Sequence, residues 1–207
     1  GLLSVRPNMG VIWVDAHADI NTPELSESGN MHGMPVGLLM NGISDTDPST
    51  IPGFEWLGQP DMIHARLDPS SVVYIGLRDV DTAERNILRE KRIKAFTMYD
   101  VDKYGIGTVM DMAIGHLLDQ DPNRPLHLSY DIDAVDPIEA PATGTAVRGG
   151  LTYREAHFVA EAVARSGSLA SAEIVELNPT LSDGDGSRET VELGLGLLTS
   201  LMGKSII

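Results

Sequence analysis

The distribution of apolar positions predicts five buried strands along the chain. Each candidate is a short apolar run, rich in β-branched residues and bounded by residues that break regular structure. The runs are nearly continuous rather than strictly alternating, which is typical of a parallel sheet covered on both faces. They extend over Gly10 to Val14, Ser71 to Leu77, Ile93 to Thr97, Pro125 to Tyr130 and Ser171 to Leu177.

Helical patterns lie between these runs. The segment from Asp81 to Arg92 opens on an acidic N-cap candidate and ends with basic residues, as the helix dipole favours. The segment from Thr152 to Ser166 begins with the capping-box pattern T-Y-R-E. Two further helices are predicted over Gly107 to Gln120 and over Ser187 to Met202, the latter with Ser187 as its N-cap. Strands that alternate with helices indicate βαβ units and an α/β fold.

The length of the chain favours one domain, which we expect to include residues 1–207. A chain of 207 residues is long enough to bury one sizeable core. We interpret the stretch from Asn41 to Pro60 as a surface loop rather than a domain linker. The chain begins Gly1-Leu2-Leu3-Ser4, without an initiator Met or a signal-peptide pattern, and we interpret it as beginning inside a longer parent.

The amino-acid composition excludes several classes of function. With 42% hydrophobic and 22% charged residues, the sequence is that of an ordinary globular protein. Zero cysteines exclude a disulfide scaffold, a cysteine nucleophile and thiolate metal ligands. No apolar run approaches the roughly 18 residues needed to span a bilayer, so no membrane partner is expected. A net charge of −15 argues against nucleic acid as a partner and raises the question of where the acids lie.

Two groups of acids follow predicted strands directly. Asp15, His17 and Asp19 come after the run that ends at Val14, and their spacing directs them to one side of an extended chain. Asp131 and Asp133 come after the run that ends at Tyr130. Ligands of open α/β sheets bind at the carboxyl ends of strands. The alternative is that both groups are polar turn residues, since Asp is common in loops.

The two groups together favour a binuclear metal site. Asp15, Asp19, Asp131 and Asp133 carry four negative charges that repel one another unless cations lie between them. Two divalent ions balance this charge and can hold a hydroxide as nucleophile at neutral pH. Oxygen ligands with one imidazole and no thiolate suit Mn²⁺ better than a structural zinc.

Three other segments contain candidate chemistry. His32, in the loop Ser28 to Gly33, could move protons near such a site, because the ordinary pKa of histidine is near neutrality. The turn Pro141 to Thr145 offers hydroxyl and backbone groups to a polar substrate. Glu176, at the end of the last predicted strand, could bind a cation such as a guanidinium. The alternatives are an exposed loop histidine and an ordinary turn.

These stretches, in this order, resemble the ureohydrolase superfamily and, within it, the arginase family most closely. The D-x-H-x-D pattern with a downstream D-x-D is specific to the superfamily, and GLRDVD points to arginases. The resemblance extends from about residue 9 to the end of the chain. The matching residues are VDAHADINTP (14–23), SGNMHG (28–33), YIGLRDVD (74–81), LSYDIDAVDP (128–137), APATGT (140–145), GGLTYRE (149–155) and EIVELNP (173–179).

The resemblance implies a fold, an activity and an assembly. The fold is a three-layer α/β/α arrangement of the arginase/deacetylase type, with a mostly parallel sheet. The activity is manganese-dependent hydrolysis of L-arginine to L-ornithine and urea, in arginine metabolism and the urea cycle. The assembly is usually a trimer, and Arg154 and Glu155, with Asp102, resemble the family's subunit contact. The implied location is the cytoplasm, although mitochondrial members also occur.

The resemblance also assigns ligands and catalytic groups. Asp15 and Asp131 would bridge two Mn²⁺ ions. Asp19 would complete the ligand set of one ion, and His17 and Asp133 would serve the other. The hydroxide held between the ions would attack the guanidinium carbon. The catalytic residues implied are His32 as proton shuttle, Asp133 as hydrogen-bond acceptor from the hydroxide, and Glu176 beside the guanidinium.

Substrate contacts are implied at both ends of arginine. Thr145 and Glu176 match residues near the guanidinium. Asn21, Ser28 and Asn30 match the loop that recognises the α-carboxylate, and Asp81 and Glu84 match the region that reads the α-amine.

The beginning of the chain departs from the family pattern. Ureohydrolases carry a Gly-Gly-Asp-His motif on an earlier strand, and its histidine ligates the first manganese. The 14 residues before Asp15 contain no His and no Asp, and fewer strands are predicted than the eight of the family sheet. Three interpretations follow: part of an active arginase whose N-terminal strands are absent here, a non-catalytic truncated partner, or another ureohydrolase such as an agmatinase.

Overall fold

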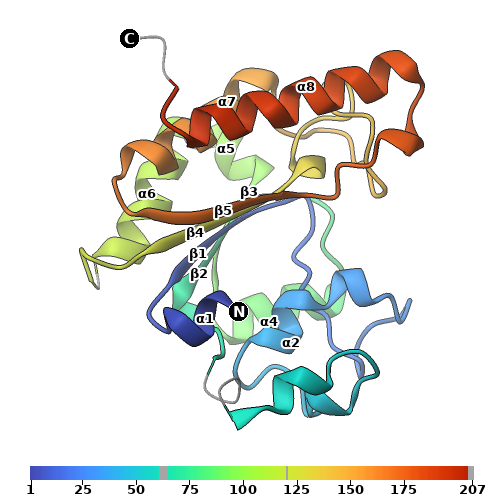
Figure 1. Ribbon diagram of the computed structural model, residues 1–207, viewed down its shortest axis with the longest axis vertical. Coiled ribbons are helices and arrows are strands. Elements are labelled where there is room, and N and C mark those ends of the chain that lie inside the picture. Colours follow the sequence, from blue (N-terminus) through green and yellow to red (C-terminus); the bar gives the residue numbers. More distant parts are fainter. Residues whose placement is uncertain (61–64, 120, 205–207) are drawn as a thin grey trace.

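The computed structural model describes residues 1–60, 65–119 and 121–204, and five strands in this part form one parallel sheet. The strand order is β3-β2-β1-β4-β5, so the first strand in sequence lies at the centre (Figure 1). The five predicted strands are confirmed, with ends shifted by one or two residues. They are β1 (Gly10–Val14), β2 (Val72–Leu77), β3 (Lys94–Thr97), β4 (Leu126–Asp131) and β5 (Leu169–Val175).

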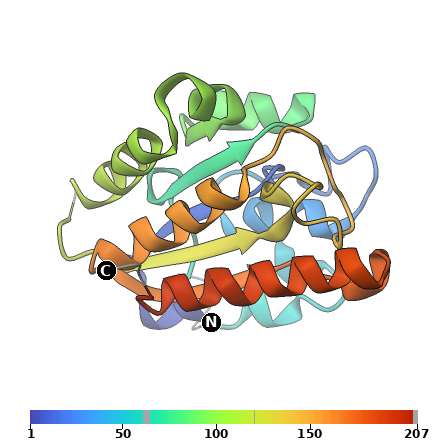
Figure 2. The same cartoon turned by 90° about the horizontal axis from the view of Figure 1, so that it is seen from above.

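Helices cover both faces of the sheet, which confirms the three-layer α/β/α fold. One face carries α5 to α8, and the other carries α1, α2 and α4 (Figures 1 and 2). The helices are α1 (Leu2–Val5), α2 (Pro35–Leu39), α4 (Thr82–Glu90), α5 (Met98–Tyr104), α6 (Ile106–Leu118), α7 (Tyr153–Arg165) and α8 (Gly184–Leu201). None of the helices in the described ranges is long and apolar enough to cross a membrane.

Two hydrophobic cores lie on opposite sides of the sheet. Ile12 of β1 packs in the core under α5 to α8, and its neighbour Val11 packs in the core against α2 and α4. Because successive side chains of a strand point to opposite faces, a strand between two cores must be apolar at nearly every position. This explains why the predicted strands are continuous apolar runs. β4 is buried along its whole length, whereas the edge strand β5 is partly exposed.

Two predicted helix starts are confirmed and one is wrong. Asp81 and Thr152 are the N-caps of α4 and α7, and both form complete capping boxes. Ser187 is not an N-cap, because α8 begins one turn earlier, where the side chain of Asp183 accepts a hydrogen bond from the backbone of Gly186 at 2.9 Å. Gln120, the predicted end of α6, lies outside the described residues.

Some elements have no counterpart in the sequence-based expectation. The short helices α1, α2 and α5 were not predicted, and the loop 41–60 contains two 3₁₀ turns, Pro48–Thr50 and Glu55–Gly58.

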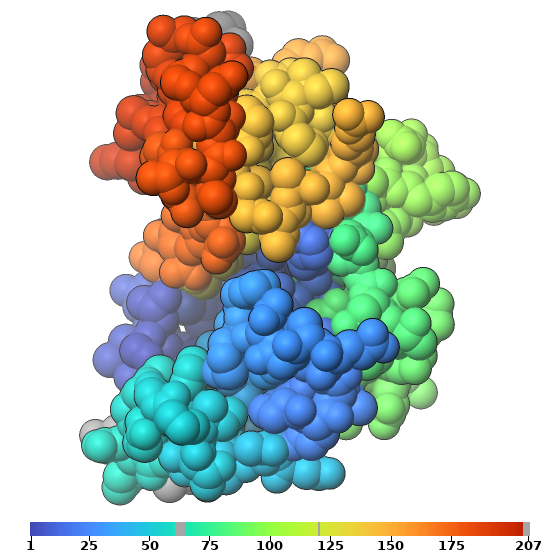
Figure 3. All heavy atoms as spheres, turned by 90° about the vertical axis from the view of Figure 1, so that its right-hand side faces the viewer, coloured from blue at the N-terminus to red at the C-terminus, as the bar shows by residue number. Residues whose placement is uncertain are grey.

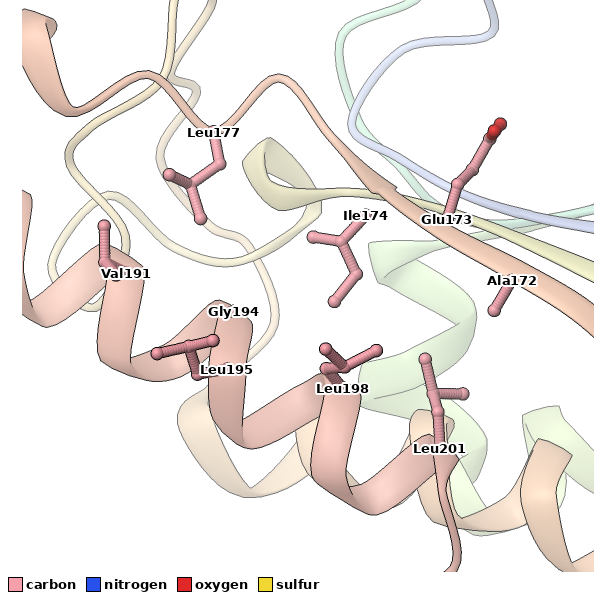
Figure 4. A pocket seen from close by; sticks show the side chains of 9 residues that line it. All are labelled: Ala172, Glu173, Ile174, Leu177, Val191, Gly194, Leu195, Leu198 and Leu201. Atoms are coloured by element: carbon pink, nitrogen blue, oxygen red, sulfur yellow. The ribbon is translucent and has the colours of Figure 1, made fainter.

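An apolar pocket of about 310 Å³ lies between β5 and α8 (Figure 4). Ile174 faces Leu198 across it and Leu177 lies against Gly194, while Glu173 points away.

Candidate metal centre

A pocket of about 520 Å³ opens at the carboxyl ends of the strands. In Figure 3 the surface there is recessed between the yellow segment that follows β4 and the blue segment that follows β1. Its lining comes from the loops after β1, β2, β4 and β5, from the last residue of β4 and from the first turn of α4. The lining residues are His17, Asp19, Asn21, His32, Gly33, Asp79, Asp81, Glu84, Asp131, Asp133, Gly144, Thr145, Glu176, Asn178 and Leu181.

Most of the predicted site residues meet in this pocket, but three are not among its lining residues: Asp15, which is buried with 1% exposure, and Ser28 and Asn30. Ser28 and Asn30 lie on an exposed loop, where the Ser28 hydroxyl accepts a hydrogen bond from the Asn30 backbone at 3.2 Å. Asp79 and Asn178 line the pocket and were not singled out in the sequence. Both lie within the motifs quoted above. Asp79 follows the end of β2 much as Asp15 follows the end of β1, and this position in the sequence could have identified it.

Asp15, His17 and Asp133 form the centre of the site. Each offers a ligand atom, and these atoms lie within 4.8 Å of one another. The Nδ1 atom of His17 is 3.1 Å from Oδ2 of Asp133 and 3.4 Å from Oδ1 of Asp15. Both carboxylates are 1% exposed. The three groups come together because β1 and β4 are neighbours in the sheet and end at the same edge.

Backbone and indole hydrogen bonds fix the two buried carboxylates. Asp15 accepts from Nε1 of Trp13 at 2.9 Å and from the backbone of His17 at 2.7 Å. Asp133 accepts from the backbone of Ala16 at 3.2 Å and from Oγ1 of Thr145 at 2.8 Å. The bend at residues 15–17, rather than a fully extended chain, turns the side chains toward one another.

Asp131 and Asp19 add two more carboxylates to the pocket. Asp131 is the last residue of β4, and its Oδ1 accepts a hydrogen bond from the backbone of Asp133 at 2.8 Å. Asp19 has a φ of +49°, in the left-handed region, and Glu176 at the end of β5 has a φ of +59°. Non-glycine residues in this region are uncommon and cluster at functional sites, where the surrounding structure holds them.

The raised pKa values of three carboxyl groups show that this arrangement disfavours their ionisation. Burial raises the pKa of Asp15 to about 6, of Asp19 to about 8 and of Asp131 to about 9. The charges of neighbouring carboxylates contribute to each of these raised values, because like charges disfavour ionisation. Burial opposes ionisation of Asp133 as well, but the hydrogen bond and charge of His17 hold the pKa of Asp133 below its usual range.

His17 carries the compensating charge of the pocket. Burial alone lowers the pKa of an imidazole, but hydrogen bonds to Asp133 and Asp15 raise the pKa of His17 to about 11. The protein therefore neutralises its buried carboxylates with a protonated histidine and with protons on Asp19 and Asp131. This donor set fits divalent cations, which replace those protons, and its oxygen ligands with one imidazole are those that Mn²⁺ accepts.

Asn21, Asp81 and Glu84 form a hydrogen-bonded wall of the pocket. Asn21 donates from Nδ2 to Oδ2 of Asp81 at 2.7 Å. Glu84 accepts from the backbone of Ile20 at 3.2 Å, and it also completes the capping box with Asp81. The α4 N-terminus is thereby tied to the loop after β1. His32 is exposed in the 3₁₀ turn Met31–Gly33, and this turn is bonded to the same loop, since the N–H of Asn21 donates to the carbonyl of Gly33 at 3.0 Å.

Comparisons with known proteins give one consistent result. The profile described as "Arginase family" matches residues 2–203. An arginase of Glaciozyma antarctica is 48% identical over 207 residues, covering 100% of this chain and 58% of that protein. An arginase of Coccidioides posadasii is 53% identical over 199 residues, covering 96% of this chain and 58% of that protein. The chain thus spans less than two thirds of these curated relatives.

A solved structure shares the fold. The crystal structure of an arginase from Bacillus subtilis superposes with a TM-score of 0.82 at 36% sequence identity. The similarity covers 100% of this chain and 68% of that one.

Proposed function

This chain belongs to the arginase family, and from that premise we propose that its pocket hydrolyses the guanidinium group of L-arginine to L-ornithine and urea. The observation that carries the proposal is the convergence of Asp15, His17 and Asp133, with ligand atoms within 4.8 Å of one another, beside a pocket lined by His17, Asp133 and further acids. Such a pocket suits divalent metals and a cationic substrate.

We assign two Mn²⁺ ions to this pocket. Asp15 and Asp131 would bind both ions, Asp19 would complete one set, and His17 and Asp133 would complete the other. Divalent ions supply activated water at neutral pH and stabilise negative charge that develops in the transition state. Among the described residues, no imidazole joins the set that contains Asp19, so we expect that ion to bind more weakly.

The chain's own residues bind the substrate and move protons in this proposal. Glu176 lines the pocket and would hold the guanidinium by charge-assisted hydrogen bonds. Thr145, which holds Asp133, would lie beside the same group. Asp133 would accept a hydrogen bond from the attacking hydroxide. His32, exposed at the rim, would transfer protons between the pocket and solvent.

The α-carboxylate and α-amine of arginine would lie toward the other wall. Asp81 and Glu84 supply negative charge for the amine, and Asn21 is linked to Asp81 by a hydrogen bond of 2.7 Å. Ser28 and Asn30 lie outside the pocket lining, so they would reach only a substrate group that extends beyond the rim. Selectivity for arginine over agmatine, which lacks the carboxylate, would depend on this region.

The test combines metal binding with substrate turnover by the full chain. Mn²⁺ is titrated by calorimetry, and urea release is then measured with L-arginine and with agmatine, with and without added Mn²⁺. The expected result is two Mn²⁺ ions per chain, one bound more weakly, and Mn²⁺-dependent urea release from L-arginine alone. Metal-saturated chain that releases no urea would make it a non-catalytic partner, and equal turnover of agmatine would overturn the substrate assignment.

Assembly is a separate part of the proposal. We assign a homotrimer whose contact includes Arg154, Glu155 and Asp102. Arg154 and Asp102 are exposed, and Glu155 is occupied in the capping box of α7, where it accepts from the backbone of Thr152 at 2.8 Å. Sedimentation of the wild-type chain and of Arg154→Ala tests it, since a monomer in both cases contradicts the assignment.

A further inference from the structure

Arg78 lies directly after β2, behind the metal centre rather than in its pocket. Its guanidinium donates to main-chain carbonyls in two segments. Nη2 donates to Asp133 O at 2.6 Å and to Val147 O at 2.7 Å. Nη1 donates to Ala134 O at 3.1 Å, and Nε donates to Val147 O at 3.2 Å. The residue is partly buried, so these carbonyls replace much of its hydration.

These carbonyls belong to the two segments that meet at the carboxylate of Asp133. One is the turn Ile132–Ala134, which follows β4 and contains Asp133 itself. The other is the loop that carries Thr145, whose hydroxyl donates to Oδ2 of Asp133 at 2.8 Å. The guanidinium thus fixes both the backbone of Asp133 and the loop that holds its side chain.

The backbone of Arg78 is tied to the third segment of the site. Its N–H donates to the carbonyl of Ala16 at 2.9 Å, and the N–H of Asp79 donates to the same oxygen at 3.0 Å. Ala16 lies between Asp15 and His17. A register shift between Ile75 and Leu77 precedes Arg78, and such bulges redirect the chain at the end of a strand. Arg78 therefore contacts both segments that contribute Asp15, His17 and Asp133, and also the loop that contains Thr145.

We propose that Arg78 is a positioning residue for the metal ligand Asp133, holding its turn and the Thr145 loop in the geometry that binds Mn²⁺. The inference rests on the proposed function, because it takes Asp133 as a ligand. A planar guanidinium reaches carbonyls in several directions at once, which a single ammonium nitrogen does not. Its bonds are charge-assisted, and so stronger than neutral ones.

The test measures Mn²⁺ affinity by calorimetry in Arg78→Ala and Arg78→Lys. Partners that orient a metal ligand typically change affinity about 10–100-fold when removed. We expect a loss in this range for Arg78→Ala and a smaller loss for Arg78→Lys, with the far-UV circular dichroism unchanged. Arg85→Ala is the matched control, because Arg85 is exposed on α4 and donates to Asp81 O and the Thr82 hydroxyl. Its Mn²⁺ affinity should equal that of the wild type.

The Arg78→Ala substitution made in an Asp133→Asn variant separates positioning of Asp133 from a general effect on stability. In Asp133→Asn, the ligand that Arg78 positions is already impaired, so adding Arg78→Ala should lower Mn²⁺ affinity by less than about 3-fold. Wild-type affinity in Arg78→Ala, or the same loss in both backgrounds, would overturn this inference alone. If Arg78→Ala does not fold, Arg78→Lys is measured in both backgrounds with the same criteria. A wild-type chain that binds no Mn²⁺ would overturn the proposed function as well, whereas metal binding without urea release would leave this inference standing.

Discussion

Thr145, an exposed residue, donates a hydrogen bond from its hydroxyl to Oδ2 of Asp133, a residue that is almost completely buried, at a distance of 2.8 Å. The same oxygen lies 3.1 Å from Nδ1 of His17. These two contacts help to keep Asp133 ionised, whereas the pKa of its neighbour Asp131 is raised to about 9 by burial and by nearby charges. A surface loop therefore influences which carboxylates of the site are free to bind a cation.

Removing this hydroxyl should weaken metal binding. Thr145→Val deletes one hydrogen bond to a charged group, which is worth about 1.5–3 kcal/mol, or roughly 10–150-fold in affinity if the effect falls fully on Mn²⁺. Thr145→Ser keeps the donor and should bind Mn²⁺ as the wild type does. Calorimetric titration of both variants is the measurement. Equal affinities would show that the 2.8 Å contact does not prepare Asp133 for metal.

Mn²⁺ binding should release protons. The metal-free chain at pH 7 carries protons on Asp19, on Asp131 and on His17, whose pKa values are about 8, 9 and 11. The ion must displace them, so affinity should rise as the pH increases from about 6 toward 9. Calorimetry in two buffers of different ionisation enthalpy counts the protons, and heats that do not depend on the buffer would contradict this.

The same groups determine how the metal-free chain responds to pH. Raised carboxyl pKa values mean that the folded chain binds more protons than the unfolded chain, from about 3.8, the ordinary Asp value, up to about 9. Its free energy of unfolding should therefore fall as the pH rises through this window. Thermal unfolding at several pH values checks the slope, and saturating Mn²⁺ should remove it. A metal-free chain that becomes more stable toward pH 9 would contradict the expectation.

Two substitutions should separate metal binding from proton transfer. Asp131→Ala removes the ligand that we propose both ions share, so both Mn²⁺ binding and urea release should be lost. His32→Asn leaves the acidic groups in place and should lower turnover by about 10²–10⁴-fold, the usual contribution of a positioned acid or base, with the metal content unchanged. Metal content is measured by atomic absorption on dialysed protein, beside the rate. An unchanged rate in His32→Asn would show that His32 does not transfer protons.

The sequence predicts the strands well for a local reason. A strand between two cores must be apolar on both faces, so β1 and β4 are readable from a single run of residues. Convergence of Asp15 with Asp133 was predictable as well, because the carboxyl ends of parallel strands share one edge. The roles of Asp15 and Asp133 as metal ligands stay predictions, and so do the substrate-binding roles of Glu176 and Asn21.

Other features depend on contacts that a single segment does not encode. The role of Arg78 could not be predicted, since its acceptors are carbonyl oxygens that every residue possesses. The start of α8 was misplaced because Ser187 and Asp183 are both good caps, and the choice depends on which one reaches a free backbone N–H. The strand order, with β1 in the centre, is likewise set by packing between distant segments.

A last prediction concerns Gly37, a buried residue of α2 that lies against the loop containing Asn21. Helix propensity alone predicts that Gly→Ala in a helix stabilises a protein by up to about 1 kcal/mol. At Gly37, however, an added Cβ would overlap the backbone carbonyl of Asn21 and lie 2.9 Å from that of Ile20. Because backbone atoms cannot rotate away, Gly37→Ala should destabilise the chain by about 1–3 kcal/mol.

The matched control is Gly115→Ala in α6, where an added Cβ meets nothing within 4 Å. This variant should be as stable as the wild type or up to about 1 kcal/mol more stable, since only helix propensity acts. If packing of α2 against the Asn21 loop decides the outcome, urea unfolding should show that the free energy of unfolding changes with opposite sign in the two variants. Stabilisation by both substitutions would mean that the loop shifts freely, and then the wall formed by Asn21 and Asp81 is not a rigid part of the pocket.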